Sequence, residues 1–131
     1  MASTGRLAVV TGGAGGLGRA FCCSLAAAGY DVVPVDLADT DRRLDVTDAA
    51  ECRALAEELR PAVWVNNAGV TGAGEFLEQD DHHVGRIVAV NLLGVVHGTR
   101  AAASTMLADG GGEILNVASL AGWAPTPHIA V

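Results

Sequence analysis

Short apolar runs alternate with longer amphipathic segments along the chain from residue 6 onward. Each run is rich in valine, leucine or isoleucine and is followed by a glycine or a polar residue. Such runs are typical of buried parallel strands, although Pro34 removes one ladder donor from the second run. The strands predicted in this way cover residues 6–11, 31–35, 62–65 and 113–118, with a brief further strand at 43–46.

The longer segments between these runs carry helix signals at their ends. Thr47 or Asp48 provides an N-cap, and Glu51 stands three residues after Asp48, in the spacing of a capping box. Gly29 and Pro61 follow two of the segments as stop signals. The helices predicted from these signals cover residues 17–28, 48–59, 80–90 and 95–107.

The alternation of strands and helices favours one fold class. Strands that are joined through helices run parallel, and their crossovers are right-handed. We therefore predict an α/β fold with a doubly wound parallel sheet of about five strands. No internal repeat or linker interrupts residues 1–131, which we interpret as one domain.

A glycine-rich turn lies between the first predicted strand and the first predicted helix. Two registers fit it: Gly13, Gly15 and Gly18 match G-x-G-x-x-G, whereas Gly12, Gly16 and Gly18 match T-G-x-x-x-G-x-G. Glycines let a pyrophosphate approach bare backbone amides, and the helix N-terminus adds unpaired N–H groups and the positive end of its dipole. The strand–turn–helix context indicates a Rossmann-type dinucleotide-binding domain.

An acidic residue closes the second predicted strand. Asp36 lies eighteen residues after Gly18, near the spacing of a carboxylate that binds the adenosine ribose hydroxyls. It would repel a 2′-phosphate, so we expect NAD as the cofactor and consider NADP less favoured. Alternatively, Arg42 or Arg43 folds back onto a 2′-phosphate, or Asp36 is only a turn residue.

Composition and charge narrow the possible partners. The net charge is −7, and the basic residues are scattered arginines without any lysine, which argues against nucleic-acid binding. The longest apolar run, residues 87–96, is interrupted by Asn91 and Gly94, and it is shorter than the roughly 20 residues that cross a bilayer. The three cysteines have no histidine at ligand spacing, so we predict no metal site. We expect a soluble, cytoplasmic protein without a membrane partner.

Several ordered motifs together identify a family. They are the glycine turn at residues 11–18, Asp-Val-Thr at 45–47, Asn-Asn-Ala-Gly at 66–69, Asn91 within a predicted helical region, and Ser119 after the last strand. In this order and over essentially the whole chain, they resemble the short-chain dehydrogenase/reductase family. The resemblance implies an oxidoreductase that moves a hydride between nicotinamide and a secondary alcohol or ketone.

The resemblance also implies roles for individual residues. Asp45 would bind the adenine, Asn91 would hold a water of the proton relay, and Ser119 would bind the substrate oxygen. Each has a structural alternative: Asn67 serves the sheet only, Asn91 satisfies a neighbouring carbonyl, and Ser119 caps the strand end. The cofactor-binding residues implied are Gly12, Gly16, Leu17, Gly18, Asp36, Leu37, Asp45, Val46, Asn67, Ala68 and Gly69.

The family's catalytic tyrosine and lysine have no counterpart in this chain. The tyrosine would follow Ser119 by thirteen residues, beyond Val131, and the chain has no lysine. Its one tyrosine, Tyr30, precedes the second strand at the opposite end of the predicted sheet. We therefore expect a truncated, N-terminal cofactor-binding half whose sheet is incomplete at its C-terminal edge and which is inactive alone. A homo-oligomer is possible, and the substrate is not specified.

Two other functions remain open at this point. The chain is alternatively a non-catalytic NAD-binding half-domain that acts as a sensor or as a partner subunit. A scaffold that binds no nucleotide would leave the glycine turn at residues 12–18, Asp36 and Asp45 without a common explanation.

Overall fold

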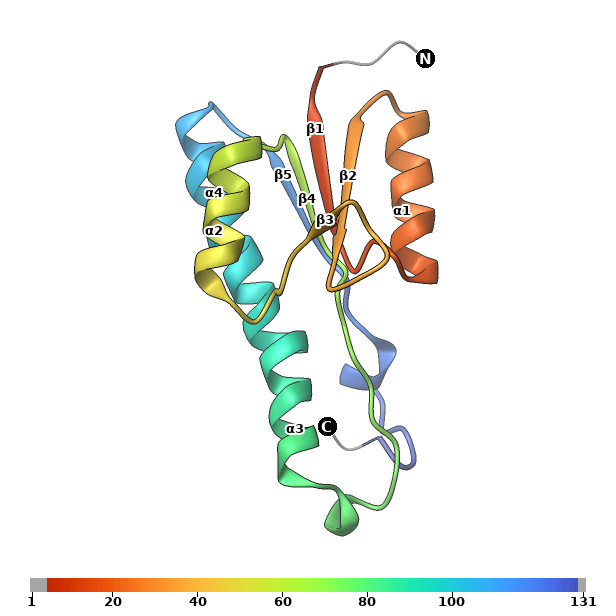
Figure 1. Ribbon diagram of the computed structural model, residues 1–131. Coiled ribbons are helices and arrows are strands. Elements are labelled where there is room, and N and C mark those ends of the chain that lie inside the picture. Colours follow the sequence, from red (N-terminus) through yellow and green to blue (C-terminus); the bar gives the residue numbers. More distant parts are fainter. Residues whose placement is uncertain (1–4, 130–131) are drawn as a thin grey trace.

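All five strands run parallel in one sheet, with the order β3-β2-β1-β4-β5. The computed structural model describes residues 5–129 (Figure 1). The predicted α/β fold class is confirmed, and β2 continues through Pro34, which pairs with Val10 of β1. The strands are β1 (Leu7–Thr11), β2 (Asp31–Asp36), β3 (Arg42–Arg43), β4 (Val63–Asn66) and β5 (Glu113–Asn116).

Helices cover both faces of the sheet. In Figure 1, α1 (Gly16–Ala27) lies on one face, and α2 (Ala49–Leu59) and α4 (Gly94–Ala108) lie on the other. Strand residues alternate between the two layers: Val9 and Trp64 pack under α2 and α4, whereas Val10 and Val65 pack toward α1. The alternation explains why the predicted strands are continuously apolar, since both faces are buried.

The N-terminus of α2 differs in one detail from its predicted capping box. The Asp48 carboxylate accepts from the amides of Ala50 and Glu51, so the predicted cap is confirmed. The Glu51 carboxylate, however, accepts from the amide of Asp45 at 2.9 Å rather than from Asp48. Glu51 thereby ties α2 to the segment before it. The strand predicted at 43–46 is instead found at Arg42–Arg43 (β3), so only Arg43 was placed correctly.

The two helices predicted at 80–90 and 95–107 form one continuous helical segment, Asp81–Ala108. It runs from α3 (Asp81–Val88) through a π-helical turn (Ala89–Leu93) into α4, and the predicted break is therefore wrong. Gly94 does not end the helix: its backbone is helical, with φ −58° and ψ −41°, and the Val46 side chain packs where a Cβ would lie. By length and composition alone this segment could cross a membrane, but its α4 part packs against α2 and β4 as a core helix does.

A partly buried polar network joins α4 to β4 and β5. The Asn66 side chain accepts from the Trp64 indole at 2.8 Å and donates to Thr99 at 3.1 Å and to Asn116 at 2.8 Å. Gly98 of α4 lies against this network: a Cβ there would meet Asn66 Oδ1 at 2.1 Å and Trp64 Nε1 at 2.7 Å. The glycine lets the helix approach the network closely.

We predict that Gly98→Ala destabilises the fold by about 1–3 kcal/mol, because the new methyl group displaces the Asn66 amide. The matched control is Gly85→Ala on the exposed side of α3, where a Cβ meets nothing within 4 Å. That change should be neutral or stabilise the helix by up to about 1 kcal/mol. Urea unfolding measures both, and equal effects of the two substitutions would contradict the packing argument.

Candidate functional site

A cavity of about 550 Å³ opens where the carboxyl ends of β1, β2, β4 and β5 meet. Ligands of open α/β sheets bind at this edge, where loops leave neighbouring strands in different directions. Arg86 of α3 is the cationic residue among those lining the cavity. All of the residues predicted to bind the cofactor line this cavity: Gly12, Gly16, Leu17, Gly18, Asp36, Leu37, Asp45, Val46, Asn67, Ala68 and Gly69.

The glycine turn has the geometry of the T-G-x-x-x-G-x-G register. Gly12 has φ +63°, and a Cβ on it would meet Ala68 Cα at 2.8 Å. A Cβ on Gly18 would lie 2.1 Å from the Gly12 carbonyl oxygen. Gly16 faces open space, while Gly13 packs on Pro34 outside the cavity wall. Close packing therefore explains Gly12 and Gly18, and Gly16 leaves the helix start accessible.

Helix α1 begins at this turn without help from side chains. Gly15 is the N-cap, so no side chain accepts from the first amides, and the first turn carries no acidic residue. Unpaired amides and the helix dipole make such an end attractive to an anion. Gly15, Gly16, Leu17 and Gly18 all line the cavity at this end.

The Thr11 hydroxyl joins the glycine turn to the segment after β4. It is buried, donates to the Val65 carbonyl at 3.2 Å, and accepts from the amides of Asn67 and Ala68 at 3.0 Å each. The Asn67 side chain returns the connection by donating to the carbonyls of Thr11 at 3.0 Å and Gly12 at 3.2 Å. These bonds fix the position of the glycine turn relative to the segment after β4, and both segments line the cavity.

The Asp36 carboxylate lies at the far side of the turn. One oxygen accepts from the Ala14 amide at 3.2 Å, and the other accepts from the Leu37 amide at 2.8 Å. These two bonds hold the side chain at the cavity edge. Both candidate arginines are paired with glutamates of α2: Arg42 with Glu58, and Arg43 with Glu51 at 3.3 Å.

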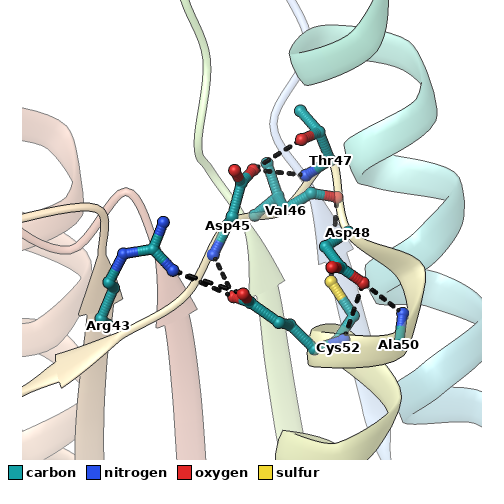
Figure 2. A network of polar contacts seen from close by, with 8 residues as sticks. Arg43, Asp45, Val46, Thr47, Asp48, Ala50 and Cys52 are labelled. Atoms are coloured by element: carbon teal, nitrogen blue, oxygen red, sulfur yellow. Dashed lines mark hydrogen bonds and ion pairs between the residues drawn. The ribbon is translucent and has the colours of Figure 1, made fainter.

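The segment between β3 and α2 forms the wall next to Asp36 (Figure 2). Asp45 accepts from the Thr47 hydroxyl at 2.7 Å and from the Thr47 amide at 2.9 Å. These bonds from Thr47, and then the charge of Arg43, hold the pKa of the Asp45 carboxyl below its ordinary value. Asp45 therefore stays ionised here, and its contribution to stability is lost only as the pH falls through that lowered pKa.

Cys52 of α2 lies beneath this wall. Figure 2 shows its thiol next to Val46, and the Sγ contacts the Val46 carbonyl at 3.8 Å. Burial first, and then the neighbouring carboxylates of Asp48, Glu51 and Asp45, raise its pKa to about 11. The thiol is thus neutral and protected near neutral pH, as expected of a structural cysteine.

The two residues predicted to take part in catalysis lie outside the cavity lining. Asn91, in the π-helical turn, donates to the Val70 carbonyl at 2.7 Å and accepts from the Val70 amide at 2.8 Å. Ser119 is exposed, and its hydroxyl accepts from the Ala121 amide at 3.1 Å at the start of a short 3₁₀ helix (Leu120–Gly122). The Asn91 contact matches its structural alternative, whereas Ser119 caps the 3₁₀ helix and not the end of β5, which is Asn116. The catalytic roles of both residues stay predictions.

Several lining residues were not predicted from the sequence. Val70 and Val117 follow β4 and β5, so their place after parallel strands is a signal that could have found them. Arg86 and Val90 come from α3 and the π-helical turn, and nothing in their spacing indicates a cavity. The unpredicted lining residues are Gly15, Leu44, Thr47, Val70, Arg86, Val90 and Val117.

Comparisons with known proteins agree on one family. The family model described as short chain dehydrogenase matches residues 38–131. The probable oxidoreductase EphD of Mycobacterium tuberculosis (strain H37Rv) is 35% identical over 147 residues, covering 95% of this chain and 25% of that protein. Galactitol 2-dehydrogenase (L-tagatose-forming) of Cereibacter sphaeroides is 33% identical over 137 residues, covering 90% of this chain and 54% of that protein.

A solved structure is similar over the same region. The crystal structure of a short chain dehydrogenase/reductase from Burkholderia phymatum in complex with NAD has a TM-score of 0.87 and 31% identity. The match covers 95% of this chain and 53% of that one. The chain thus spans about half the length of such relatives, and a quarter of EphD.

We predict that Thr11→Val lowers the free energy of unfolding by about 1–3 kcal/mol, since a buried carbonyl and two partly buried amides lose their partner. Thr11→Ser, which keeps the hydroxyl, should recover most of this. The matched control is Thr105→Val, because the buried Thr105 hydroxyl donates only within its own helix, to Ala102. Chemical denaturation of the three variants measures the effect, and similar losses at positions 11 and 105 would contradict a special role for Thr11.

Proposed function

Because the chain belongs to the short-chain dehydrogenase/reductase family, we propose that its cavity binds NAD. We further propose that the whole protein uses NAD to oxidise a secondary alcohol or to reduce a ketone. The observation that carries the proposal is the joining, in one cavity, of an uncapped helix start at Gly16 with a carboxylate at Asp36. The first suits a pyrophosphate, and the second suits a ribose with free hydroxyls.

The residues that line the cavity fit the pyrophosphate, the ribose and the adenine of the dinucleotide. At Gly16 a side chain would project into open space, so glycine keeps the first amides of α1 accessible to an anion. The Asp36 carboxylate lies beside this point, held through the Ala14 amide of the same turn. Leu37 and Val46 provide apolar surface next to it, suited to an adenine ring.

The arrangement of charges supports NAD over NADP. A 2′-phosphate on the ribose would approach the Asp36 carboxylate and would need a cation to compensate. Arg42 and Arg43 are the nearest candidates in sequence, but each is engaged with a glutamate of α2. Moving either arginine would break an ion pair and still leave the carboxylate in place.

The other end of the cavity would receive the nicotinamide. Bound NAD supplies the hydride acceptor for alcohol oxidation. Gly69, Val70 and Val117 line this end, and Asn91 holds the Val70 backbone through two hydrogen bonds. We assign Asn91 to this border and, following the family pattern, Ser119 to the substrate oxygen.

We propose that residues 1–131 bind the cofactor but do not turn over substrate alone. The family reaction uses a tyrosine activated by a lysine, and this chain has no lysine. Its tyrosine, Tyr30, immediately precedes β2, at the amino end of the strands. The guanidinium carbon of Arg6 lies 5.3 Å from the centre of the Tyr30 ring. The cavity lies at the carboxyl ends of the strands, so Tyr30 cannot serve it.

We predict that Asp36→Ala weakens NAD binding about tenfold or more while weakening NADP binding less, because the ribose loses its acceptor and the phosphate loses a repulsive neighbour. The matched control is Asp41→Ala, an exposed carboxylate outside the cavity lining. Isothermal titration calorimetry measures both affinities for each variant. An unchanged NAD-to-NADP ratio in Asp36→Ala would show that the ribose assignment is wrong, and no NAD binding by the unaltered chain would overturn the proposed function.

A further inference from the structure

Val46 lines the cavity, yet its contacts behind the wall come from two helices. Its carbonyl oxygen lies 3.0 Å from Nδ1 of His97 in α4 and 3.8 Å from the Cys52 thiol in α2. Its side chain packs directly over Gly94, where a Cβ would lie 2.8 Å from Val46 Cγ2. One cavity residue is therefore held from behind by both helices of this layer.

This support matters because the wall has no strand partner at Val46. The last backbone bond from this segment to the sheet joins the Leu44 amide to the Asp36 carbonyl at 2.9 Å, and α2 begins at Ala49. Residues 45–48 therefore depend on side chains and on local turns for their shape. Asp45 is held by Glu51 through its amide, and Asp48 closes a turn onto the Asp45 carbonyl at 3.1 Å. The contact from His97 is the one that ties this stretch to α4 through a hydrogen bond.

The chemistry of the contact decides which group donates. A carbonyl oxygen only accepts, so the hydrogen of the bond is on Nδ1 of His97. The partners are 51 residues apart in the sequence, and the contact is partly buried. No spacing rule in the sequence links His97 to Val46.

We propose that His97 is a positioning residue for the adenosine end of the cofactor: it holds the Val46 carbonyl and so fixes the wall against which adenine packs. The inference rests on the proposed function, because it requires that a dinucleotide occupies the cavity. His97 acts through Val46 and does not itself line the cavity. Replacing His97 should therefore weaken the binding of ligands that contain adenosine and leave the binding of other ligands unchanged.

The test compares His97→Leu, which removes the donor, with His97→Asn, whose side-chain amide can donate from a similar position. The control is His82→Leu, an exposed histidine on α3 outside the cavity lining. Binding of NAD, AMP and nicotinamide mononucleotide is measured by titration followed by NMR, which also detects weak binding. We expect His97→Leu to weaken NAD and AMP about three- to tenfold, the range for loss of one hydrogen bond, and to leave nicotinamide mononucleotide unchanged.

A second measurement needs no ligand. The rate at which Cys52 is alkylated at pH 8 reports how often the wall above it opens, because this thiol is buried beneath Val46. The rate should rise in His97→Leu and return toward the original value in His97→Asn. A general loss of structure would weaken AMP and nicotinamide mononucleotide alike. Such a defect would also not be rescued by asparagine.

The outcomes separate the two proposals. If the unaltered chain binds NAD and AMP, and His97→Leu binds them equally well, the role of His97 is wrong while the proposed function stands. Equal weakening of all three ligands, or no rescue by His97→Asn, also overturns the positioning role. If the unaltered chain binds neither NAD nor AMP, the proposed function itself fails, and Cys52 alkylation still decides whether His97 holds the Val46 segment.

Discussion

The cavity depends on one buried hydroxyl, that of Thr11. A parallel sheet aligns the carboxyl ends of its strands, but it does not by itself set the loops that leave those ends. The Thr11 hydroxyl connects the end of β1 to the amides of Asn67 and Ala68 after β4, and the Asn67 side chain bonds back to the carbonyls of Thr11 and Gly12. The glycine turn and the neighbouring loop therefore move as one unit. Because the unit is held by bonds among its own residues, it is preorganised for a ligand that needs bare amides at the start of α1.

Most of the fold could be predicted from the sequence because its signals are local. The apolar run that ends at Thr11, the cap at Asp48 and the glycine turn each act over a few residues, and parallel order follows from alternation. The eleven residues predicted for the cofactor also meet at one cavity, since a parallel sheet brings the residues after its strands to one edge. Local rules pointed to the glycine turn and Asp36, whereas Asp45, Val46 and residues 67–69 were predicted from the resemblance to the family.

The features that could not be predicted depend on contacts between distant segments. The helical segment Asp81–Ala108 passes through Gly94 without a break, and Val46, far away in sequence, packs against that glycine. Glu51 bonds to Asp45 instead of completing its capping box, and His97 bonds to Val46. All three departures involve residues 45–48, which follow the last backbone bond to β2, from Leu44 to Asp36, and which contact α2 and α4. Periodicity gives no information about such a stretch, yet it forms the wall beside Asp36.

The central claim is that the cavity between the glycine turn and the Val46 segment holds a dinucleotide. Mapping the backbone amide shifts of the isotope-labelled chain during a titration with NAD tests this most directly. We expect saturable shifts at Gly16, Leu17 and Gly18, at Leu37 after Asp36, and around Val46, with little change near Tyr30 at the opposite end of the strands. Shifts that cluster elsewhere, for example around Arg60 and Asp109, or that never saturate, would contradict it.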